Sequence, residues 1–308
     1  MTTRNRLLLA LDRTLVLFVG LGVGAIVGAS LIGGAAPDQA HAGTPQPVAA
    51  PSGVQPAAAE LAAQIGPRLL RTAAAEGTIQ VGVFGDSFGD GIWAGLYHQL
   101  ASAEGIEVHK LSRQATGFTR YRTTDLLDDT RRRLAQRPVD IAILSFGAND
   151  IQGIYLDGRG APFMSERWRG IVSERASAVV ALLRQNGAAI YWVGLPTMRD
   201  PAFDAQIRQI NAFYAPLMRS LGVPFVETAG MTADESGRYA PYLTDPRTGR
   251  RFMARANDGV HMTIPGYVHL TRGLSRDIER SIVEARARGG SAPTRTAEGA
   301  GGARRAAR

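Results

Sequence analysis

The sequence predicts an α/β protein, with a three-layer α/β/α domain built around a mainly parallel sheet of five strands. Two observations predict this class. Five short apolar runs alternate with five longer segments of helical spacing, as in sheets whose strands are joined by crossover helices. The apolar runs are mostly unbroken by polar residues, which is typical of strands that are covered on both faces.

The strands are predicted from these apolar runs, at residues 79–84, 106–111, 140–146, 189–193 and 224–227. The first run contains β-branched residues and stops at Gly85-Asp86. Because parallel strands end at one edge of a sheet, we expect the residues that follow these runs to meet at that edge.

The helices are predicted at residues 91–103, 124–136, 165–185, 204–220 and 264–286. Ser165 followed by Glu166 is a start signal for the third helix, and Asn186-Gly187 is a stop signal. Residues 228–257 depart from the alternation, being rich in Gly, Pro and Arg. Within them, Asp245 to Gly249 predicts a turn in a hairpin or lid.

Both ends of the chain differ from this domain, which is predicted at residues 77–288. Residues 1–42 are predicted to be a signal peptide or an N-terminal membrane anchor. Arginines precede the uncharged stretch 14–37, and Ala40-His41-Ala42 fits a cleavage site. Residues 43–76 are expected to form a Pro/Ala-rich linker with a short helix, and residues 289–308 a disordered basic tail.

Either interpretation of the N-terminus places the domain outside the cytoplasm, as a periplasmic or other extracytoplasmic protein. The protein is then secreted or anchored in the inner membrane, and an uncleaved N-terminal segment would be its contact with the membrane. The formal net charge of the whole chain is +8, and the part that falls on the central domain is scattered rather than gathered in a stripe, so no nucleic-acid partner is expected. The absence of cysteine excludes disulfides, thiol catalysis and cysteine-bound zinc.

The residues most typical of catalysis begin with Ser87, which follows the first predicted strand directly. A serine at a strand-to-helix turn is exposed at the carboxyl edge of the sheet, with its amide free beside a helix start. Ester hydrolysis by serine also needs a base, a group that orients the base, and donors for the oxyanion. His261 is the candidate base, and Asp258 lies three residues earlier, close enough to orient it.

Two further residues are candidates for the oxyanion pocket. Asn149 follows the third predicted strand in Gly147-Ala148-Asn149-Asp150, so its side-chain amide is expected at the same edge as Ser87. A glycine amide after the second strand, at Gly117, is the other candidate beside the amide of Ser87. No metal and no cofactor is required by this set of residues.

These four blocks resemble those of the SGNH (GDSL) hydrolase superfamily, over residues 79–286. The resemblance implies a flavodoxin-like sheet, a triad of Ser87, His261 and Asp258, and an oxyanion hole from Ser87, Gly117 and Asn149. It does not determine the substrate, because the superfamily includes lipases, thioesterases, arylesterases and carbohydrate esterases. Phe88 stands where the family usually has leucine, a departure that we expect to lie outside the chemistry.

The same residues also occur in proteins of other functional classes. Gly85, Ser87 and Gly89 also match the nucleophile elbow of α/β-hydrolases, but that fold places several strands before its serine, and only a linker precedes the first strand here. A metal-dependent phosphoesterase would need ligands from a set poor in histidine: Asp86, Asp90, Asp150, Asp258 and His261. A non-catalytic envelope binding protein is a third class. The sequence predicts an exported serine esterase that hydrolyses an ester, expected to be an acetyl ester, on a cell-envelope glycan or a small molecule. An O-acetyltransferase with the same triad is the closest alternative.

The sequence also suggests a substrate class. The exported domain resembles periplasmic family members that act on acetylated cell-surface polymers. Tyr242, Arg250 and Arg251 lie in the segment before Asp258; aromatic rings stack on sugars, and arginines bind carboxylates. We therefore expect an ester substrate, an acetylated and anionic glycan, with an arginine-rich surface loop as the alternative explanation.

Overall fold

The computed structural model describes residues 64–121 and 123–290. These residues all belong to one structural unit, Pro56–Arg308. The predicted leader or anchor, most of the linker and almost all of the basic tail lie outside the described residues. Within the described ranges, no helix combines the length and apolarity needed to cross a membrane.

Five parallel strands form the central sheet. They are β1 (Ile79–Gly85), β2 (Ile106–Lys110), β3 (Ile141–Ser145), β6 (Ala189–Val193) and β7 (Phe225–Val226). Their spatial order is β2-β1-β3-β6-β7, and every neighbouring pair is parallel. This is the flavodoxin-like order, in which the direction of winding reverses between the first and third strands. Both the α/β class and the five-stranded parallel sheet are therefore confirmed.

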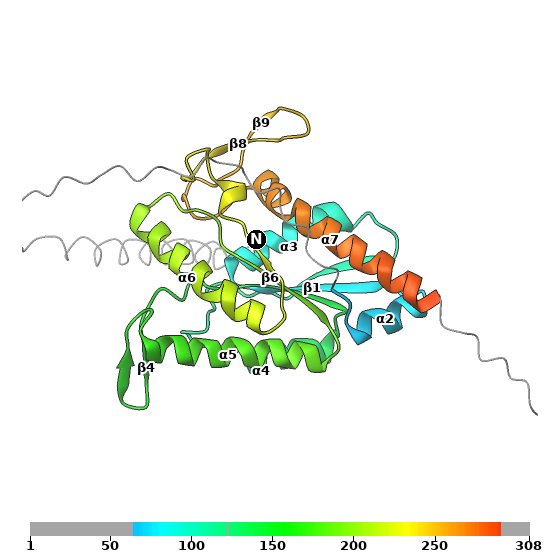
Figure 1. Cartoon of the computed structure of the whole chain (residues 1–308), viewed down its shortest axis with the longest axis horizontal. Coiled ribbons are helices and arrows are strands. Elements are labelled where there is room, and N and C mark those ends of the chain that lie inside the picture. The colour runs from blue at the N-terminus through cyan, green and yellow to red at the C-terminus, as the bar shows by residue number, and fades with distance from the viewer. Residues whose placement is uncertain (1–63, 122, 291–308) are drawn as a thin grey trace, which may run out of the picture. The chain divides into compact units, whose positions relative to one another are not determined.

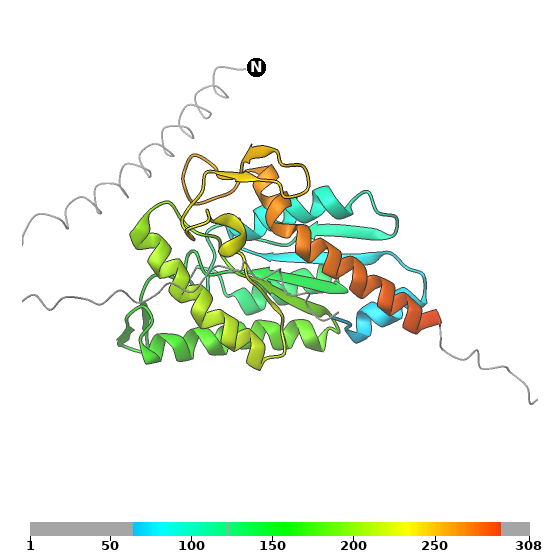
Figure 2. The ribbon, with the colours of Figure 1, turned by 45° about the horizontal axis from the view of Figure 1, so that its top comes forward.

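Helices cover both faces of this sheet (Figures 1 and 2). One face carries α2 (Pro67–Ala74), α3 (Ser87–Leu100) and α7 (Ile264–Gly290), which pack on one another. The other face carries α4 (Leu126–Gln136) and α5 (Glu166–Gln185), and α6 (Pro201–Ser220) packs against α5 through Phe213 and Trp168. Strands β3 and β6 are buried along their whole length, which explains their unbroken apolar sequence.

Aspartate caps move the starts of two helices earlier than their apolar pattern suggests. The Asp86 side chain accepts from the Phe88 amide, so α3 begins at Ser87 rather than at residue 91. Asp200 caps α6 in the same way, and Pro201 suits the first helical position, where its missing N–H has no partner to lose. The predicted Ser165 cap on α5 is confirmed, because its side chain accepts from the Trp168 amide.

Helix α2 is packed on the domain. Leu69 and Ala73 are buried, and Thr72 Oγ1 donates to Asp140 Oδ1 over 2.7 Å. Arg68 Nε lies 3.4 Å from the same carboxylate oxygen. Asp140 precedes β3 and also accepts from the Gln80 amide in β1, so it joins α2 to the sheet.

Two antiparallel hairpins extend from the domain. The predicted turn at Asp245 to Gly249 joins β8 (Tyr242–Thr244) to β9 (Arg251–Met253), and the Gly249 amide donates to Asp245 O over 2.8 Å. The second hairpin, β4 (Ile154–Leu156) with β5 (Arg159–Ala161), was not predicted. Its turn is Asp157-Gly158, both at positive φ, which is a strong local signal for a two-residue hairpin turn.

Candidate active site

The candidate nucleophile, Ser87, is the first residue of α3 and follows the end of β1 by two residues. Asp86, between them, accepts the Phe88 amide on Oδ1 over 2.8 Å and so sharpens the turn. Ser87 is half-buried, and its own amide has no acceptor among the described residues. A hydroxyl and a free N–H therefore lie together at a helix N-terminus, where developing negative charge is favoured.

Asp258 and His261 occupy a single tight turn between β9 and α7. Asp258 Oδ1 accepts from the amides of Val260 and His261, over 2.8 and 2.9 Å. Its other oxygen, Oδ2, lies 2.7 Å from His261 Nδ1. The backbone bonds orient the carboxylate, and the carboxylate in turn orients the imidazole ring.

The imidazole joins this turn to the nucleophile. His261 Nε2 lies 2.8 Å from Ser87 Oγ, although the two residues are 174 positions apart in the chain. When Nδ1 carries the proton and donates to Asp258, Nε2 is free to accept the proton of Ser87. The structure thus brings together the three residues proposed as the triad.

The charge of Asp258 suits an orienting role. Partial burial alone would raise the pKa of this carboxyl, but hydrogen bonds from His261 Nδ1 and from the Val260 and His261 amides lower it. The net pKa is below the ordinary value, so Asp258 is a carboxylate at neutral pH. A carboxylate at this position favours the imidazole tautomer that carries its proton on Nδ1.

Phe88 contacts the candidate base, contrary to the expectation that it lies outside the chemistry. Its ring is stacked on the His261 imidazole, with centroids 5.2 Å apart and planes 28° apart. Because Phe88 is also buried, its ring packs against one face of the imidazole in a fixed position. The sequence signal for this role was the aromatic residue directly after Ser87, in a position where the family usually has leucine.

Asn149 follows β3 and lies beside Asp86, at the turn that leads into Ser87. Its Nδ2 donates to Thr116 O over 3.0 Å and to Asp86 Oδ2 over 3.2 Å. The structure therefore brings Asn149 to the block that contains Gly117.

Gly117 lies against the buried carboxyl of Asp150. A Cβ at this position would come within 2.5 Å of Asp150 Oδ1, so only glycine fits without displacement. The Gly117 amide has no acceptor among the described residues. Asp150 itself is structural, since its Oδ1 accepts from the amide and the hydroxyl of Thr119, both over 2.8 Å.

Two buried carboxyl groups lie beneath the site. Burial raises the pKa of Asp86 to about 7, with the nearby Asp150 adding to the increase; the Phe88 amide and Asn149 oppose it. Burial also raises the pKa of Asp150. The buried Tyr214 hydroxyl lies near both groups, and its pKa is raised by burial and by their charges. Burial therefore favours the protonated form of Asp86.

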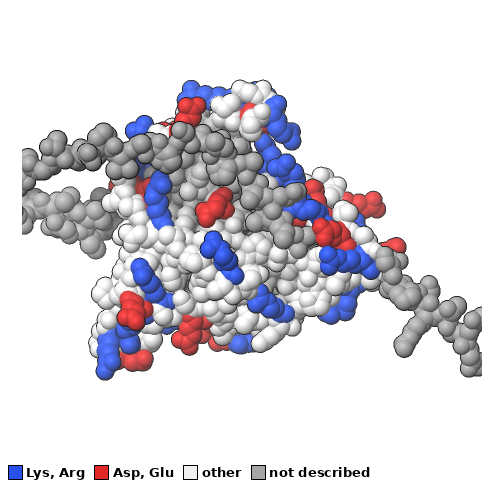
Figure 3. Space-filling model, viewed as in Figure 1, with Lys and Arg blue, Asp and Glu red and all other residues white. Residues whose placement is uncertain are grey.

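The predicted substrate-binding residues are on or next to the β8–β9 hairpin. Tyr242 and Arg251 share its outward face, and the Arg251 guanidinium lies 4.6 Å from the centroid of the Tyr242 ring. Arg250 is exposed at the end of the turn. Leu243 and Phe252 point to the opposite, inner face and pack on the core. Figure 3 shows basic side chains around this end of the molecule.

The side chains proposed for a metal site do not form one cluster. No group of three or more His, Asp or Glu side chains in the described part of the chain is arranged to hold a metal. Asp90 instead bonds Lys110 Nζ and Gln114 Nε2, each over 2.9 Å, and also the Ser112 hydroxyl. These bonds hold the loop after β2 against α3.

Several solved structures are similar to this protein. A GDSL-like lipase from Bacteroides thetaiotaomicron is 17% identical over 71% of this chain and 97% of its own, with a TM-score of 0.46. An acetylxylan esterase from Geobacillus stearothermophilus, in a catalytic mutant, is 17% identical over 66% and 94%, with a TM-score of 0.44. The periplasmic domain of a Salmonella ser. Paratyphi A lipopolysaccharide acetyltransferase is 14% identical over 68% and 93%, with a TM-score of 0.48. No curated protein sequence matches this chain.

The resemblance to the SGNH superfamily is confirmed. The sheet has the expected strand order, and the blocks around Ser87, Gly117, Asn149 and His261 meet at its carboxyl edge. The family described as "Protein of unknown function (DUF459)" matches residues 80–277, which include all four blocks and most of the described domain. The chain belongs to the DUF459 family, with the strand order and motif arrangement of the SGNH superfamily.

Proposed function

We propose that this protein is a serine esterase that hydrolyses an acyl ester through Ser87, His261 and Asp258. One observation carries the proposal, the continuous chain of hydrogen bonds from Ser87 Oγ through His261 to Asp258. A nucleophile, a base within hydrogen-bond reach and a group that orients the base are the elements that acyl transfer requires.

In the first half of the reaction, Ser87 Oγ attacks the ester carbonyl carbon while its proton passes to His261 Nε2. The carbonyl oxygen becomes an oxyanion. When this tetrahedral intermediate collapses, the bond to the alcohol oxygen breaks, and His261 returns the proton to the departing alcohol. The products of this half are the free alcohol and an acyl group on Ser87.

In the second half, water attacks the acyl-enzyme and gives its proton to His261 Nε2. Collapse of the second intermediate releases the carboxylic acid, and the proton on His261 returns to Ser87 Oγ. Asp258 remains a carboxylate throughout and stabilises the imidazolium in both halves. No redox step and no bound cofactor enters this scheme.

We assign the oxyanion to the amides of Ser87 and Gly117 and to the side chain of Asn149. The two backbone amides are the free donors described above. Asn149 Nδ2 would exchange its 3.2 Å bond to Asp86 for the oxyanion and keep its bond to Thr116 O. Donors aimed at developing charge lower the barrier more than they stabilise the bound ester.

The first test is turnover of p-nitrophenyl acetate by the wild type, by Ser87→Ala and by Ser220→Ala. Ser220 is an exposed serine at the end of α6 and serves as the matched control. We expect turnover in the wild type and the control, a loss of at least about 10³-fold in Ser87→Ala, and no effect of EDTA. EDTA-sensitive turnover that survives in Ser87→Ala would instead establish a metal-dependent mechanism.

We further propose that the substrate is an acetylated, anionic glycan of the cell envelope, reached outside the cytoplasm. The uncharged stretch 14–37 supports export, and it lies outside the described residues. The exposed Arg250 and Arg251 beside Tyr242 support an anionic polymer, because guanidinium groups bind carboxylates and the Arg–Tyr pair offers a flat surface to a sugar.

This substrate class is tested separately from the chemistry. We expect Arg250→Ala with Arg251→Ala to raise KM severalfold on an acetylated polyuronate but to leave turnover of p-nitrophenyl acetate unchanged. Arg169→Ala, an exposed arginine on α5, is the control. Equal KM values for the double variant and the wild type on the polyuronate would reject the anionic glycan and leave the esterase proposal intact.

A further inference from the structure

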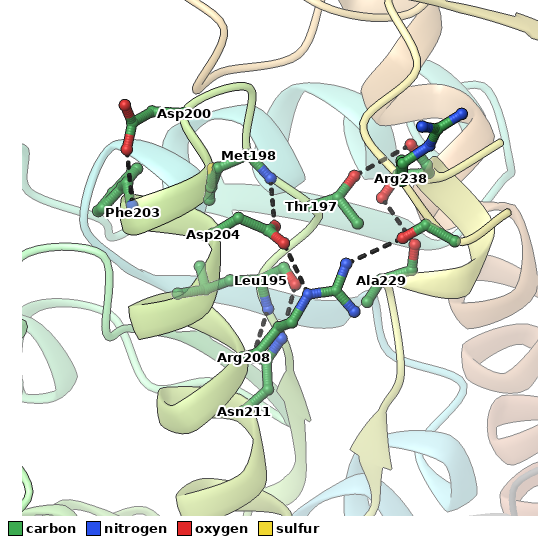
Figure 4. Close-up of polar contacts among 12 residues, drawn as sticks. Leu195, Thr197, Met198, Asp200, Phe203, Asp204, Arg208, Asn211, Ala229 and Arg238 are labelled. Atoms are coloured by element: carbon green, nitrogen blue, oxygen red, sulfur yellow. Dashed lines mark hydrogen bonds and ion pairs between the residues drawn. The ribbon is translucent and has the colours of Figure 1, made fainter. Parts of the chain in front are cut away.

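The segment that follows β6 is held firmly by α6 (Figure 4). The Asn211 side chain makes two hydrogen bonds to the backbone of Leu195. Its Oδ1 accepts from the Leu195 amide over 2.9 Å, and its Nδ2 donates to the Leu195 carbonyl over 2.7 Å. Three residues later, the Met198 amide donates to Asp204 Oδ1 over 2.7 Å, and Arg208 Nε holds the other Asp204 oxygen over 2.6 Å. The backbone up to Met198 is therefore tied to one rigid helix.

Arg199, the next residue, is bonded to the turn that carries Asp258 and His261. Its amide donates to Gly259 O over 2.9 Å. Its side chain donates from Nη1 to Asn257 O over 2.9 Å and from Nη2 to Asp258 O over 3.0 Å. Three successive carbonyls of the turn thus accept from this single residue, two of them from the forked guanidinium and one from the backbone amide.

Gly259 makes this close approach possible. It has φ +76°, which favours glycine, and a Cβ there would come within 2.4 Å of Arg199 Nε. The guanidinium therefore lies directly over the backbone of the turn. A side chain at Gly259 would push Arg199 away from the carbonyls that it bonds.

Arg255 holds the same turn from within. This side chain is 1% exposed, and its Nη2 donates to Val260 O over 3.1 Å and also to Thr197 O. Thr197 belongs to the segment that α6 holds. Arg255 therefore links the turn to that segment a second time, from the buried side.

We propose that Arg199 is a positioning residue, which fixes the turn so that His261 Nε2 stays in line with Ser87 Oγ. The proposal rests on the serine esterase function. The turn needs such a support, because the side chains of Asp258 and His261 are 48% and 36% exposed, and the stacking of Phe88 on one face of the imidazole does not by itself fix the backbone of the turn. A displacement of about 1 Å between reacting groups lowers rates about 100-fold, so a loose turn would slow the proton transfer.

The test compares Arg199→Ala and Arg199→Lys with Arg184→Ala. Arg184 is the matched control, an exposed arginine that donates to a backbone carbonyl, Leu221 O, remote from the triad. For Arg199→Ala we expect kcat on p-nitrophenyl acetate to fall about 10- to 100-fold, with KM changed less than about twofold. Arg199→Lys should retain part of kcat, since one ammonium reaches fewer carbonyls than a guanidinium. Arg184→Ala should match the wild type.

Added ethylguanidinium separates positioning from a general loss of stability. Arg199 is exposed, so this small cation can enter the space that the alanine variant leaves and bond the same carbonyls. We expect it to raise the kcat of Arg199→Ala severalfold, and to leave the wild type and Arg184→Ala unchanged. A kcat of Arg199→Ala equal to that of the wild type would overturn the proposal.

Proton NMR provides a readout that does not depend on turnover. The proton on His261 Nδ1 that is held by Asp258 should give a downfield resonance in the wild type and in Arg184→Ala, and the resonance should broaden or vanish in Arg199→Ala. If the wild type shows no Ser87-dependent turnover, the esterase proposal fails while this resonance still reports on the turn. An unchanged resonance in Arg199→Ala would count against Arg199 as the support.

Discussion

Asp86 has two roles that follow from its two oxygens. Oδ1 caps α3 directly beside the nucleophile, and Oδ2 accepts from the candidate oxyanion donor Asn149. The side chain is fully buried, which raises its pKa to about 7. A protonated Asp86 holds Asn149 less strongly than the carboxylate does, so the protonation state of this residue affects how freely Asn149 turns to an oxyanion.

The raised pKa of Asp86 also predicts how stability depends on pH. The folded state binds this proton more tightly than the unfolded state, whose pKa is near the ordinary 3.8. Stability should therefore fall as pH rises from about 4 to about 7, by up to about 1.4 kcal/mol per pH unit from this group. Asp86→Asn should lack this component in urea unfolding measured across that window. Parallel pH dependences in the two proteins would contradict the assignment.

Helices α3 and α7 approach closely because two glycines of α3 face α7. A Cβ at Gly91 would come within 1.9 Å of the Tyr267 ring, and one at Gly95 within 2.6 Å of the Thr271 hydroxyl. This contact matters for the site, since Ser87 begins α3 and the turn with His261 leads directly into α7. The glycines thus set the separation of the two elements that carry the proposed nucleophile and the proposed base.

Two glycine substitutions test this contact with opposite expected signs. Gly91→Ala should lower the free energy of unfolding by about 1–3 kcal/mol or more, because Tyr267 is buried and must move. Gly170→Ala on the exposed side of α5 meets nothing within 4 Å and should raise it by about 0.5–1 kcal/mol. Thermal unfolding measures both. A Gly91→Ala variant with the unfolding free energy and the turnover of the wild type would show that the α3–α7 contact is not tight.

At the scale of the whole molecule, the site lies where the winding of the sheet reverses. Ser87 follows β1 and Asn149 follows β3, and these adjacent strands have helices on opposite faces. Open α/β sheets bind ligands at this place, since the connections diverge there and leave a crevice. At the opposite end of β3, helix α2 packs on the domain and contacts Asp140, the residue directly before that strand.

The role of α2 predicts where the folded unit begins. Residues 64–290 should unfold cooperatively and keep the turnover of the full chain. Removing α2, as in residues 77–290, exposes the surface that Leu69 and Ala73 cover and takes Thr72 and Arg68 from buried Asp140. We expect the free energy of unfolding to fall by about 3 kcal/mol or more in residues 77–290, as measured by urea unfolding. Equal stability of the two fragments would show that α2 is dispensable.

The sequence by itself determined the five strands of the central sheet, the class of sheet and the identity of the triad candidates. Apolar runs report burial on both faces, which depends on local composition. Asp258 and His261 lie within one turn, so their hydrogen bond follows from short-range geometry. The starts of α3 and α6 were placed too late, because an aspartate cap overrides the apolar periodicity that marks a helix interior.

Only the tertiary structure decided the contacts between segments that are distant in the chain. It brought His261 to Ser87, stacked Phe88 on the imidazole and directed Asn149 toward Asp86. It also placed Arg199 over the turn that carries Asp258 and His261, a contact that no sequence motif marks. Such contacts depend on how helices and strands pack, and side chains separated by more than a hundred residues meet only after the sheet and its helices are assembled.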